Sequence, residues 1–253
     1  MTTTLKLKAT IPPELDLSRR LAVATPPANP TVEPELHYLL PAGVTLYTTR
    51  LPVSASTRLE TRNEGYVHNY DALYESFGAL KPSSLLIGLT GPSYRLGPDG
   101  DEELAARLTA AAGAPVLTVS LAIRKALVAL GAERLNLVSP YPGWLTDKAV
   151  AYWEAAGFTV RNVVKDQEDF RAYDLTTEDV VALLERVPFE DADATVMSGT
   201  GMITIPAIQG ARQDVARPIL SSNLCGAWWL TGQAGLAASE ALRRSCPELA
   251  GAL

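Results

Sequence analysis

Short apolar runs alternate along the chain with segments whose apolar residues recur at helical spacing. The runs are nearly uninterrupted by polar residues, which is typical of strands buried on both faces. This alternation, with a glycine closing several of the helical segments, predicts an α/β fold in which mostly parallel sheets are flanked by helices. Strands are predicted at residues 20–25, 43–51, 84–89, 115–120, 134–139, 158–163, 194–198 and 218–222, and helices at 101–113, 121–131, 145–157 and 176–187.

Two of the predicted strands run into the same kind of bend. The segments "LLIGLTGPS" and "ATVMSGTGMI" are each an apolar strand that ends in a Thr-Gly pair, at Thr90 and Gly91 and again at Thr200 and Gly201. Such an echo indicates two similar halves, although Thr-Gly is a common turn pair and chance similarity is the alternative.

If the two bends are equivalent, Leu89 and Gly199 face one another across a cleft between the halves. Ligands of parallel sheets collect at the carboxyl ends of the strands. Function is therefore expected at these bends.

Composition and charge exclude several classes of partner. The chain has 253 residues, 47% of them hydrophobic, and 22 Lys plus Arg against 28 Asp plus Glu give a net charge of -6. This balance offers no electrostatic footprint for nucleic acid or an anionic membrane surface. The first fifteen residues lack the apolar core of a signal peptide, and no apolar run approaches the about 20 residues that span a bilayer. A cytoplasmic protein is expected.

Cysteine and histidine are too sparse for a metal or disulfide framework. Cys225 and Cys246 are the two cysteines, and they stand in no metal-ligand spacing with His37 and His68. No metal site is predicted. Neither histidine has a paired carboxylate in view that would indicate acid or base chemistry.

The bends carry residues that bind anions. Thr, Gly and Ser at a strand end leave N–H and hydroxyl groups pointing into the cleft, where they hold a carboxylate and stabilise charge that develops on it. The alternative is that both segments are simply tight turns. The candidates are Thr90, Gly91 and Ser93 in one half, and Ser198, Gly199, Thr200 and Gly201 in the other.

Three further polar residues lie near predicted strand ends. Tyr141 follows the strand in "LVSPYPGW" and either reaches the cleft or anchors its own loop. Asn29, between prolines in "TPPANPTVE", either points its amide at a ligand or caps the helix that begins near Pro30. Tyr94, next to Ser93, is a candidate hydrogen-bond donor to a ligand.

Five motifs in order give the chain a family resemblance. The segments "TPPANPTVEPELHYLLPAGVTLYTTRL", "LLIGLTGPSYRLG", "VSPYPGWLTDKAVAYWEAAGFTV", "SGTGMITIPAI" and "PILSSNLCGAWWLTGQAG" are similar to the aspartate/glutamate racemase superfamily, in its maleate cis-trans isomerase and arylmalonate decarboxylase branch. The resemblance implies a cofactor-free enzyme of two pseudo-symmetric α/β lobes with the active site between them. We expect one lobe at residues 1–117 plus 221–253 and the other at 118–220.

The resemblance also assigns residues. Asn29 matches a substrate-binding asparagine, Thr90 and Gly91 match a carboxylate-binding turn, and Tyr141 matches the family tyrosine. The two cysteines that flank the substrate carbon in racemases of this kind fall on Leu89 and Gly199, so both thiols are absent.

The missing thiols change the expected chemistry. Neither Leu89 nor Gly199 exchanges a proton, which excludes two-thiol racemisation and covalent addition to maleate. Leu89 also implies that part of the ligand is hydrocarbon. Cys225, at the start of the helix after the last strand, is a candidate relocated proton donor, since a helix N-terminus lowers a thiol pKa. The alternative is that Cys225 is an apolar packing residue.

The sequence thus predicts a cofactor-independent enzyme of the arylmalonate decarboxylase and maleate isomerase type, acting on a small carboxylic or dicarboxylic acid. Decarboxylation, or another lyase or isomerase step through an enediolate-like state, fits better than racemisation, with Tyr141, Cys225 or water as proton donor. The alternative is a catalytically degenerate protein that binds a carboxylate. The expected partner is a small carboxylate, with neither nucleic acid nor membrane, and a homo-oligomer stays open.

Overall fold

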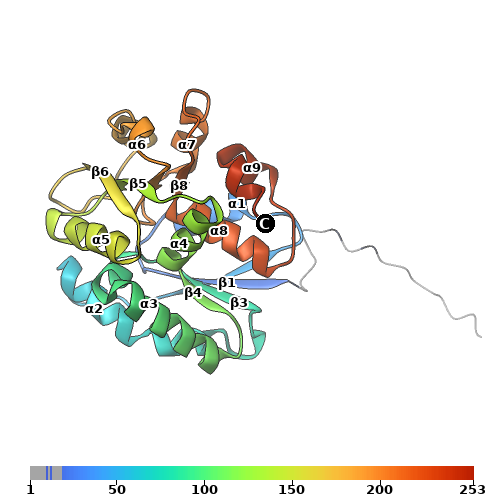
Figure 1. Ribbon diagram of the computed structural model, residues 1–253. Coiled ribbons are helices and arrows are strands. Elements are labelled where there is room, and N and C mark those ends of the chain that lie inside the picture. Colours follow the sequence, from blue (N-terminus) through green and yellow to red (C-terminus); the bar gives the residue numbers. More distant parts are fainter. Residues whose placement is uncertain (1–9, 11, 13–18) are drawn as a thin grey trace, which may run out of the picture.

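The computed structural model describes residues 10, 12 and 19–253 of the chain. These residues form two four-stranded sheets in which every paired strand is parallel, with the strand orders β2-β1-β3-β4 and β6-β5-β7-β8 (Figure 1). The predicted α/β fold of two lobes is confirmed. The strands are β1 (Arg20–Thr25), β2 (Thr45–Arg50), β3 (Ser84–Ile87), β4 (Val116–Thr118), β5 (Arg134–Ser139), β6 (Thr159–Lys165), β7 (Ala194–Met197) and β8 (Ile219–Ser221).

Helices connect the strands and cover both sheets (Figure 1). Short 3₁₀ segments lie at η2 (Tyr70–Ala72), η3 (Glu75–Leu80) and η4 (Phe189–Asp191). The α-helices are α1 (Val32–Leu39), α2 (Leu59–His68), α3 (Gly91–Ala112), α4 (Val119–Ala129), α5 (Gly143–Ala155), α6 (Thr177–Leu184), α7 (Ile205–Ala211), α8 (Ser222–Gln233), α9 (Glu240–Ser245) and α10 (Pro247–Ala250).

The two faces of the first sheet belong to different cores. Leu21 and Val23 of β1 point into the large core that also holds α1, α4, α8 and the second sheet. Ala22 and Ala24 point to the opposite face and pack against α2 and α3. Alternate residues of a strand face opposite sides of its sheet, so a continuous apolar run is what this doubly covered strand requires.

The strand orders of the two sheets correspond one to one, because β1 to β4 occupy the same places as β5 to β8. The Thr90-Gly91 bend follows β3 and the Thr200-Gly201 bend follows β7, which are equivalent strands. Likewise Pro26 follows β1 where Pro140 follows β5. The internal echo in the sequence is therefore a true repeat of topology.

Helix α3 begins earlier than its apolar pattern indicates. The pattern predicts a helix from residue 101, whereas helical structure starts at Gly91 directly after the bend. A kink at Gly97, with φ 75°, and Pro98 separate this first portion from the rest of α3. Glycine adopts such a positive φ without the steric cost that other residues meet. The early start places the N-terminus of α3 directly at the Thr90-Gly91 bend.

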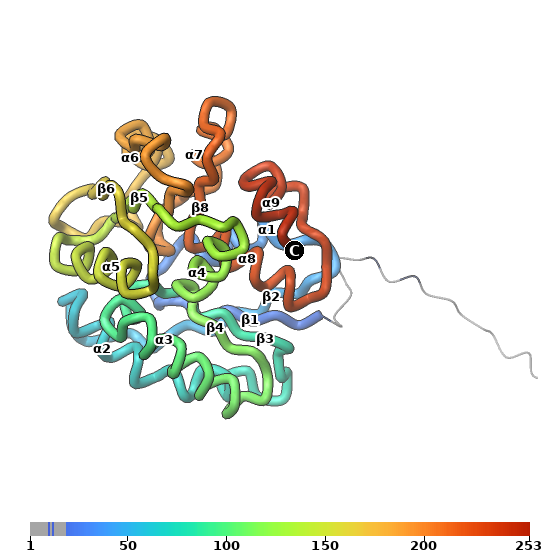
Figure 2. The backbone as a smooth tube through the Cα atoms, in the orientation of Figure 1, coloured from blue at the N-terminus to red at the C-terminus, as the bar shows by residue number. Residues whose placement is uncertain are grey.

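The chain crosses back to the first lobe after the last strand. Figure 2 shows the C-terminal helices, in orange to red, beside the blue α1, and α8 and α9 both contact α1.

Within residues 10, 12 and 19–253, no helix is both long enough and apolar enough to cross a membrane.

Candidate functional site

A small cavity lies where the carboxyl ends of the two sheets meet. Its volume is about 40 Å³, measured as the space open to the centre of a water molecule. A single water needs roughly 10–15 Å³ by that measure, so the cavity accommodates only a small ligand without rearrangement. It is lined by Pro26, Leu59, Arg62, Asn63, Tyr66, Leu89, Thr90, Gly91, Pro92, Tyr141, Phe170, Ala172, Tyr173, Gly199, Thr200 and Gly201.

A hydroxyl pair joins the two lobes inside the cavity. The Thr90 Oγ1 and Tyr141 Oη atoms lie 2.6 Å apart, and the Phe170 ring stacks on Tyr141 at 5.9 Å between centroids. Burial raises the pKa of Tyr141 well above its usual range, with a smaller contribution from Tyr94. The phenol is therefore neutral at physiological pH and acts as a hydrogen-bond donor to charge that appears beside it.

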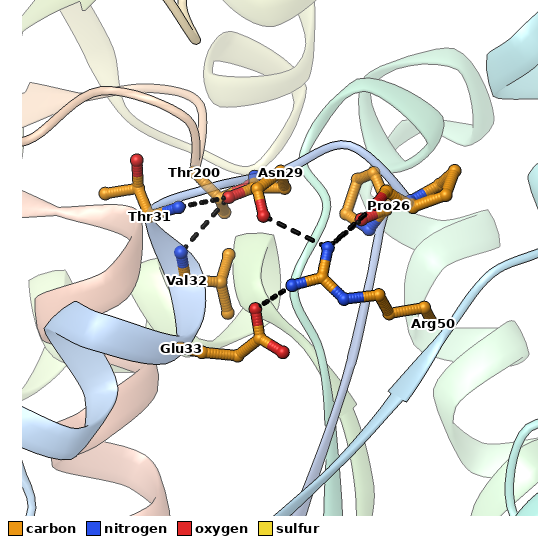
Figure 3. A network of polar contacts seen from close by, with 8 residues as sticks. Pro26, Asn29, Thr31, Val32, Glu33, Arg50 and Thr200 are labelled. Atoms are coloured by element: carbon orange, nitrogen blue, oxygen red, sulfur yellow. Dashed lines mark hydrogen bonds and ion pairs between the residues drawn. The ribbon is translucent and has the colours of Figure 1, made fainter.

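Asn29 caps a helix and holds the second bend (Figure 3). Its Oδ1 accepts hydrogen bonds from the backbone N–H groups of Thr31 at 2.9 Å and Val32 at 3.1 Å, which are the contacts that the capping alternative for Asn29 expects. Its Nδ2 donates to Thr200 Oγ1 at 3.0 Å, and that hydroxyl donates to the Gly88 carbonyl at 3.0 Å. Asn29 thus fixes Thr200 against the opposite lobe and does not line the cavity.

Arg50 stiffens the loop that carries Asn29. Its Nη1 donates to the Pro27 carbonyl at 2.8 Å and to the Asn29 carbonyl at 3.2 Å, and its Nη2 pairs with Glu33 (Figure 3). Arg50 therefore holds the loop after β1 through its backbone carbonyls and also holds helix α1 through Glu33. Asn29 is placed by this support as much as by the prolines around it.

Leu89 and Gly199, the positions at which the sequence resemblance places the two family cysteines, both line the cavity. Gly199 has φ +83°, a conformation that L side chains rarely adopt. A Cβ there would lie 2.9 Å from Pro140 Cγ and 3.3 Å from Tyr141 Oη. The structure thus has no room for a side chain at Gly199, and Leu89 supplies an apolar wall.

Three predicted ligand contacts are directed elsewhere. Tyr94 Oη pairs with Ser198 Oγ at 2.8 Å, and Ser93 Oγ donates to Asp101 Oδ1 at 3.0 Å. These hydroxyls are buried and used within the protein, and none of the three residues lines the cavity. Tyr94 and Ser198 bond to each other across the two lobes and Ser93 bonds to Asp101 within α3, so a contact of these residues with a ligand stays a prediction.

Cys225 also lies outside the cavity. It is fully buried in α8, and burial raises its pKa well above the usual range. The expectation of a lowered thiol pKa is wrong because loss of solvation outweighs the helix N-terminus. The packing alternative is supported, and Cys246 is likewise buried.

Neither histidine reaches the cavity, and both His37 and His68 are exposed. Among the residues that the structure describes, no cluster of three or more His, Cys, Asp or Glu side chains is arranged to hold a metal ion.

Sequence reasoning missed one whole wall of the cavity. Arg62, Asn63 and Tyr66 of α2 line it, as do Phe170 and Tyr173 of the loop after β6. The segment "LETRNEGYVH" of α2 has few apolar residues, so no helical apolar face marks it in the sequence.

Glu35 is a buried carboxylate that supports the second bend. It accepts hydrogen bonds from the N–H groups of Thr204 at 2.6 Å and Ile205 at 2.9 Å, and from Asn223 Nδ2 at 2.7 Å. Asn223 also donates to the Thr200 carbonyl at 3.2 Å. Burial raises the Glu35 pKa, and these hydrogen bonds oppose the rise. A carboxylate from the first lobe therefore anchors the start of α7 in the second.

Replacing Glu35 by glutamine is expected to lower the free energy of unfolding by about 1–3 kcal/mol, because the new amide N–H₂ meets the Asn223 amide donor and leaves buried donors unpaired. Chemical denaturation monitored by circular dichroism measures the change. The matched control is Glu33→Gln on the same helix, where the partly exposed pair with Arg50 is worth about 0–1 kcal/mol. Equal losses in both variants would contradict the anchoring role of Glu35.

The paired sheets and the cavity between equivalent strand ends define a two-lobed α/β protein with one shared site. The model of the arylmalonate decarboxylase family matches residues 21–244, and the chain belongs to this family.

Named relatives agree with this assignment. The maleate isomerase of Nocardia farcinica (strain IFM 10152) is 28% identical over 230 residues, covering 83% of this chain and 88% of the relative. The crystal structure of the maleate isomerase from Pseudomonas putida S16 is similar with a TM-score of 0.83 at 19% identity, covering 92% of this chain and 99% of that one. Unliganded arylmalonate decarboxylase is similar with a TM-score of 0.72 at 21% identity, covering 88% and 96%. These relatives are enzymes, and the family to which the chain belongs is an enzyme family.

Proposed function

We propose that this protein is a decarboxylase of small carboxylic acids that works through an enediolate-like state without a thiol. Family membership supports an enzyme of the arylmalonate decarboxylase and maleate isomerase type. The choice of decarboxylation rests on the residues of the cavity. Of the reactions in this branch, it is the one that needs no sulfur to break its bond.

One observation carries the proposal. Leu89 and Gly199 occupy the two positions at which thiols are expected, and the hydroxyls of Thr90 and Tyr141 lie in the same cavity. Such a site has hydrogen-bond donors for an oxyanion and an apolar wall, but no sulfur base to remove a proton from carbon. Loss of carbon dioxide starts from a carboxylate and requires no such base.

The bond-breaking step follows from these groups. The bond between the α-carbon and the departing carboxylate breaks, and its electron pair moves into the remaining carboxylate to form the enediolate. The Tyr141 hydroxyl and the N–H groups of the bends stabilise the oxygen charge, which is largest after the bond has broken. Leu89 strips water from the departing carboxylate, and this desolvation favours neutral carbon dioxide over the anion.

The protonation step also proceeds without a thiol. An enediolate of a carboxylic acid is a far stronger base than a phenolate, so a phenol with a raised pKa still transfers its proton to carbon. In the proposed step the O–H bond of Tyr141 breaks, the new C–H bond forms, and water returns a proton to the phenolate. Cys225 has no part in it, since its buried thiol does not line the cavity.

The proposed mechanism does not include a covalent cysteine adduct. A solved mutant of the Nocardia farcinica maleate cis-trans isomerase carries a covalently bound succinylcysteine intermediate. The chain described here has two cysteines, and neither lines the cavity. Isomerisation of maleate by a cysteine adduct is therefore not expected.

Proton NMR in deuterated water tests the proposal with a panel of substituted malonates, maleate, aspartate and hydantoins. We expect one or more malonates to lose carbon dioxide and to gain one solvent deuterium at the α-carbon. Aspartate is the internal control, because its α-proton exchange requires the missing thiols. Tight binding of malonates without product would instead indicate a carboxylate-binding protein, and α-exchange of aspartate would contradict the proposed chemistry.

A further inference from the structure

Asp101 is a fully buried carboxyl group on which three elements of the structure converge. Its Oδ1 accepts a hydrogen bond from Ser93 Oγ at 3.0 Å. Its Oδ2 accepts hydrogen bonds from Thr118 Oγ1 at 2.8 Å and from Tyr152 Oη at 2.9 Å. Ser93 lies in the first turn of α3, Thr118 ends β4, and Tyr152 belongs to α5 of the other lobe. One carboxyl group thus connects the start of α3 to both lobes.

Asp101 has no cation that would offset its burial. Among the residues that the structure describes it forms no ion pair, and Arg124 pairs with the neighbouring Glu102. Burial raises the pKa of Asp101 from 3.8 to about 6, against the opposing effect of the three hydroxyl donors. Burying a carboxyl group without a counter-charge costs free energy that an apolar residue does not cost. Packing alone therefore does not account for a carboxyl group at this position.

The kink in α3 isolates the turn that follows the Thr90-Gly91 bend. Gly97 and Pro98 separate residues 91–96 from the longer part of the helix, which contains Asp101. A helical segment this short is not stable by itself and depends on contacts with the rest of the protein. The bond from Ser93 to Asp101 is such a contact, and it crosses the kink.

The same turn carries the bend at the cavity. The backbone N–H of Tyr94 donates to the Thr90 carbonyl at 3.1 Å, so the turn and the bend form one hydrogen-bonded unit. Thr90 and Gly91 line the cavity, whereas Ser93 and Asp101 do not. Tyr94 holds the unit to the other lobe through its bond to Ser198, and Ser93 holds it to Asp101. A shift of Ser93 would therefore move the bend.

We propose that Asp101 is a positioning residue that acts through Ser93 to hold the Thr90-Gly91 bend in the geometry that stabilises the enediolate. This inference rests on the proposed function, in which the N–H groups of the bends stabilise the oxygen charge. A displacement of about 1 Å in such a site can cost roughly 10²-fold in rate. Hydrogen bonds to an ionised acceptor are shorter and stronger than neutral ones, which suits a carboxylate to this task.

The Ser93→Ala variant tests the proposal, because it removes the bond to Asp101 and leaves the carboxyl group in place. Measurements are made at about pH 8, where Asp101 is ionised. We expect kcat for carbon dioxide release from the best malonate to fall at least about 10-fold, with KM changed less than about 2-fold. Loss of a donor geometry that acts on the transition state lowers kcat and spares KM, whereas a loss of stability alone produces no such split.

Hydrogen exchange measures the same link without turnover. Peptides that cover residues 90–97 report on the first turn of α3, including the amide of Tyr94. We expect this amide to exchange at least about 10-fold faster in Ser93→Ala, because the turn opens more easily without its bond to an ionised group.

Three further variants serve as controls. Ser245→Ala also removes a buried serine hydroxyl from a helix, one that donates to the Ala241 carbonyl at 2.8 Å and lies outside the cavity. It should change neither kcat nor exchange in residues 90–97. Ser93→Thr keeps a hydroxyl and should recover most of the lost turnover. Ser93→Ala combined with Asp101→Asn should be no slower than the slower single variant, because both changes act on one bond.

The outcomes separate this inference from the proposed function. A parent protein that turns over malonate beside an equally active Ser93→Ala variant overturns the positioning role and leaves the proposed function standing, even if exchange is faster. A parent protein that turns over no acid of the panel overturns the proposed function. Faster exchange in Ser93→Ala would then still support the hold of Asp101 on the bend, and unchanged exchange would overturn it. A lower kcat at constant KM, restored in Ser93→Thr, supports the positioning role.

Discussion

Replacement of Tyr141 by phenylalanine is expected to reduce turnover about 10²–10³-fold, the usual loss when one donor to a developing oxyanion is removed. The phenol lies 2.6 Å from the Thr90 hydroxyl, lines the cavity and stays neutral because burial raises its pKa. It therefore gives its hydrogen bond, and in the proposed mechanism its proton, at the moment charge develops. Steady-state release of carbon dioxide from the best malonate of the panel measures the effect.

The matched control for this variant is Tyr74→Phe. Tyr74 donates its hydroxyl to the Pro82 carbonyl at 2.8 Å and does not line the cavity. Turnover should be unchanged, although each variant loses one phenol. Binding of the substrate should weaken far less than turnover in Tyr141→Phe, because the lost donor acts mainly on the transition state. Equal turnover in the two variants would refute the assigned role.

The free energy of unfolding of the parent protein, minus that of the Asp101→Asn variant, is expected to fall by roughly 3 kcal/mol as the pH rises from about 4 to above about 6. Asp101 is fully buried in α3 and accepts hydrogen bonds from the hydroxyls of Ser93, Thr118 and Tyr152. Burial raises its pKa from 3.8 to about 6, against the opposing effect of those hydrogen bonds. Tyr152 belongs to α5 of the other lobe, so this carboxyl group also joins the lobes.

The direction of the effect follows from proton binding. Between the unfolded and folded pKa values of Asp101, the folded protein binds more protons than the unfolded chain does. Its contribution to stability is thus complete below about pH 4 and is lost as the pH passes through about 6. Denaturation at several pH values measures the difference between parent and variant, in which shared groups such as Asp193, whose pKa is lowered to about 2, cancel. A difference that is constant or increases with pH would show that burial does not dominate at Asp101.

Much of the architecture is predictable from the sequence for physical reasons. Strands buried on both faces must be continuous apolar runs, and β1 is observed at the predicted residues 20–25. The Thr-Gly pairs mark equivalent strand ends because the bends need small or hydroxyl-bearing residues there. The location of the shared cavity follows from the two echoing segments.

The roles of several single residues depend on their burial, which residue type alone does not give. Cys225 has the position of an activated thiol but the surroundings of an apolar residue, and the surroundings dominate. The sequence pattern does mark Glu35 and Asp101. Glu35 lies three residues after the buried Val32 and four before the buried Leu39. Asp101 lies three, four and seven residues before buried side chains of α3. A carboxylate on the apolar face of a helix indicates a buried anchor.

Helix α2 shows the limit of pattern reading. A polar helix is held in place by the tertiary structure, so its apolar periodicity is weak and its residues look like loop. Arg62 and Asn63, on the side of α2 that lines the cavity, are both polar.

The hydrogen bonds that cross between the bends restrict how a ligand arrives. Thr200 is bonded to Gly88 and Asn29 of the opposite lobe, and Thr31 donates to the Gly201 carbonyl at 2.8 Å. Swinging the lobes apart would break all of these contacts at once. We therefore expect a ligand to enter and leave the cavity through local movement of α2 and the neighbouring loop of Phe170. The two sheets are expected to keep their relative position.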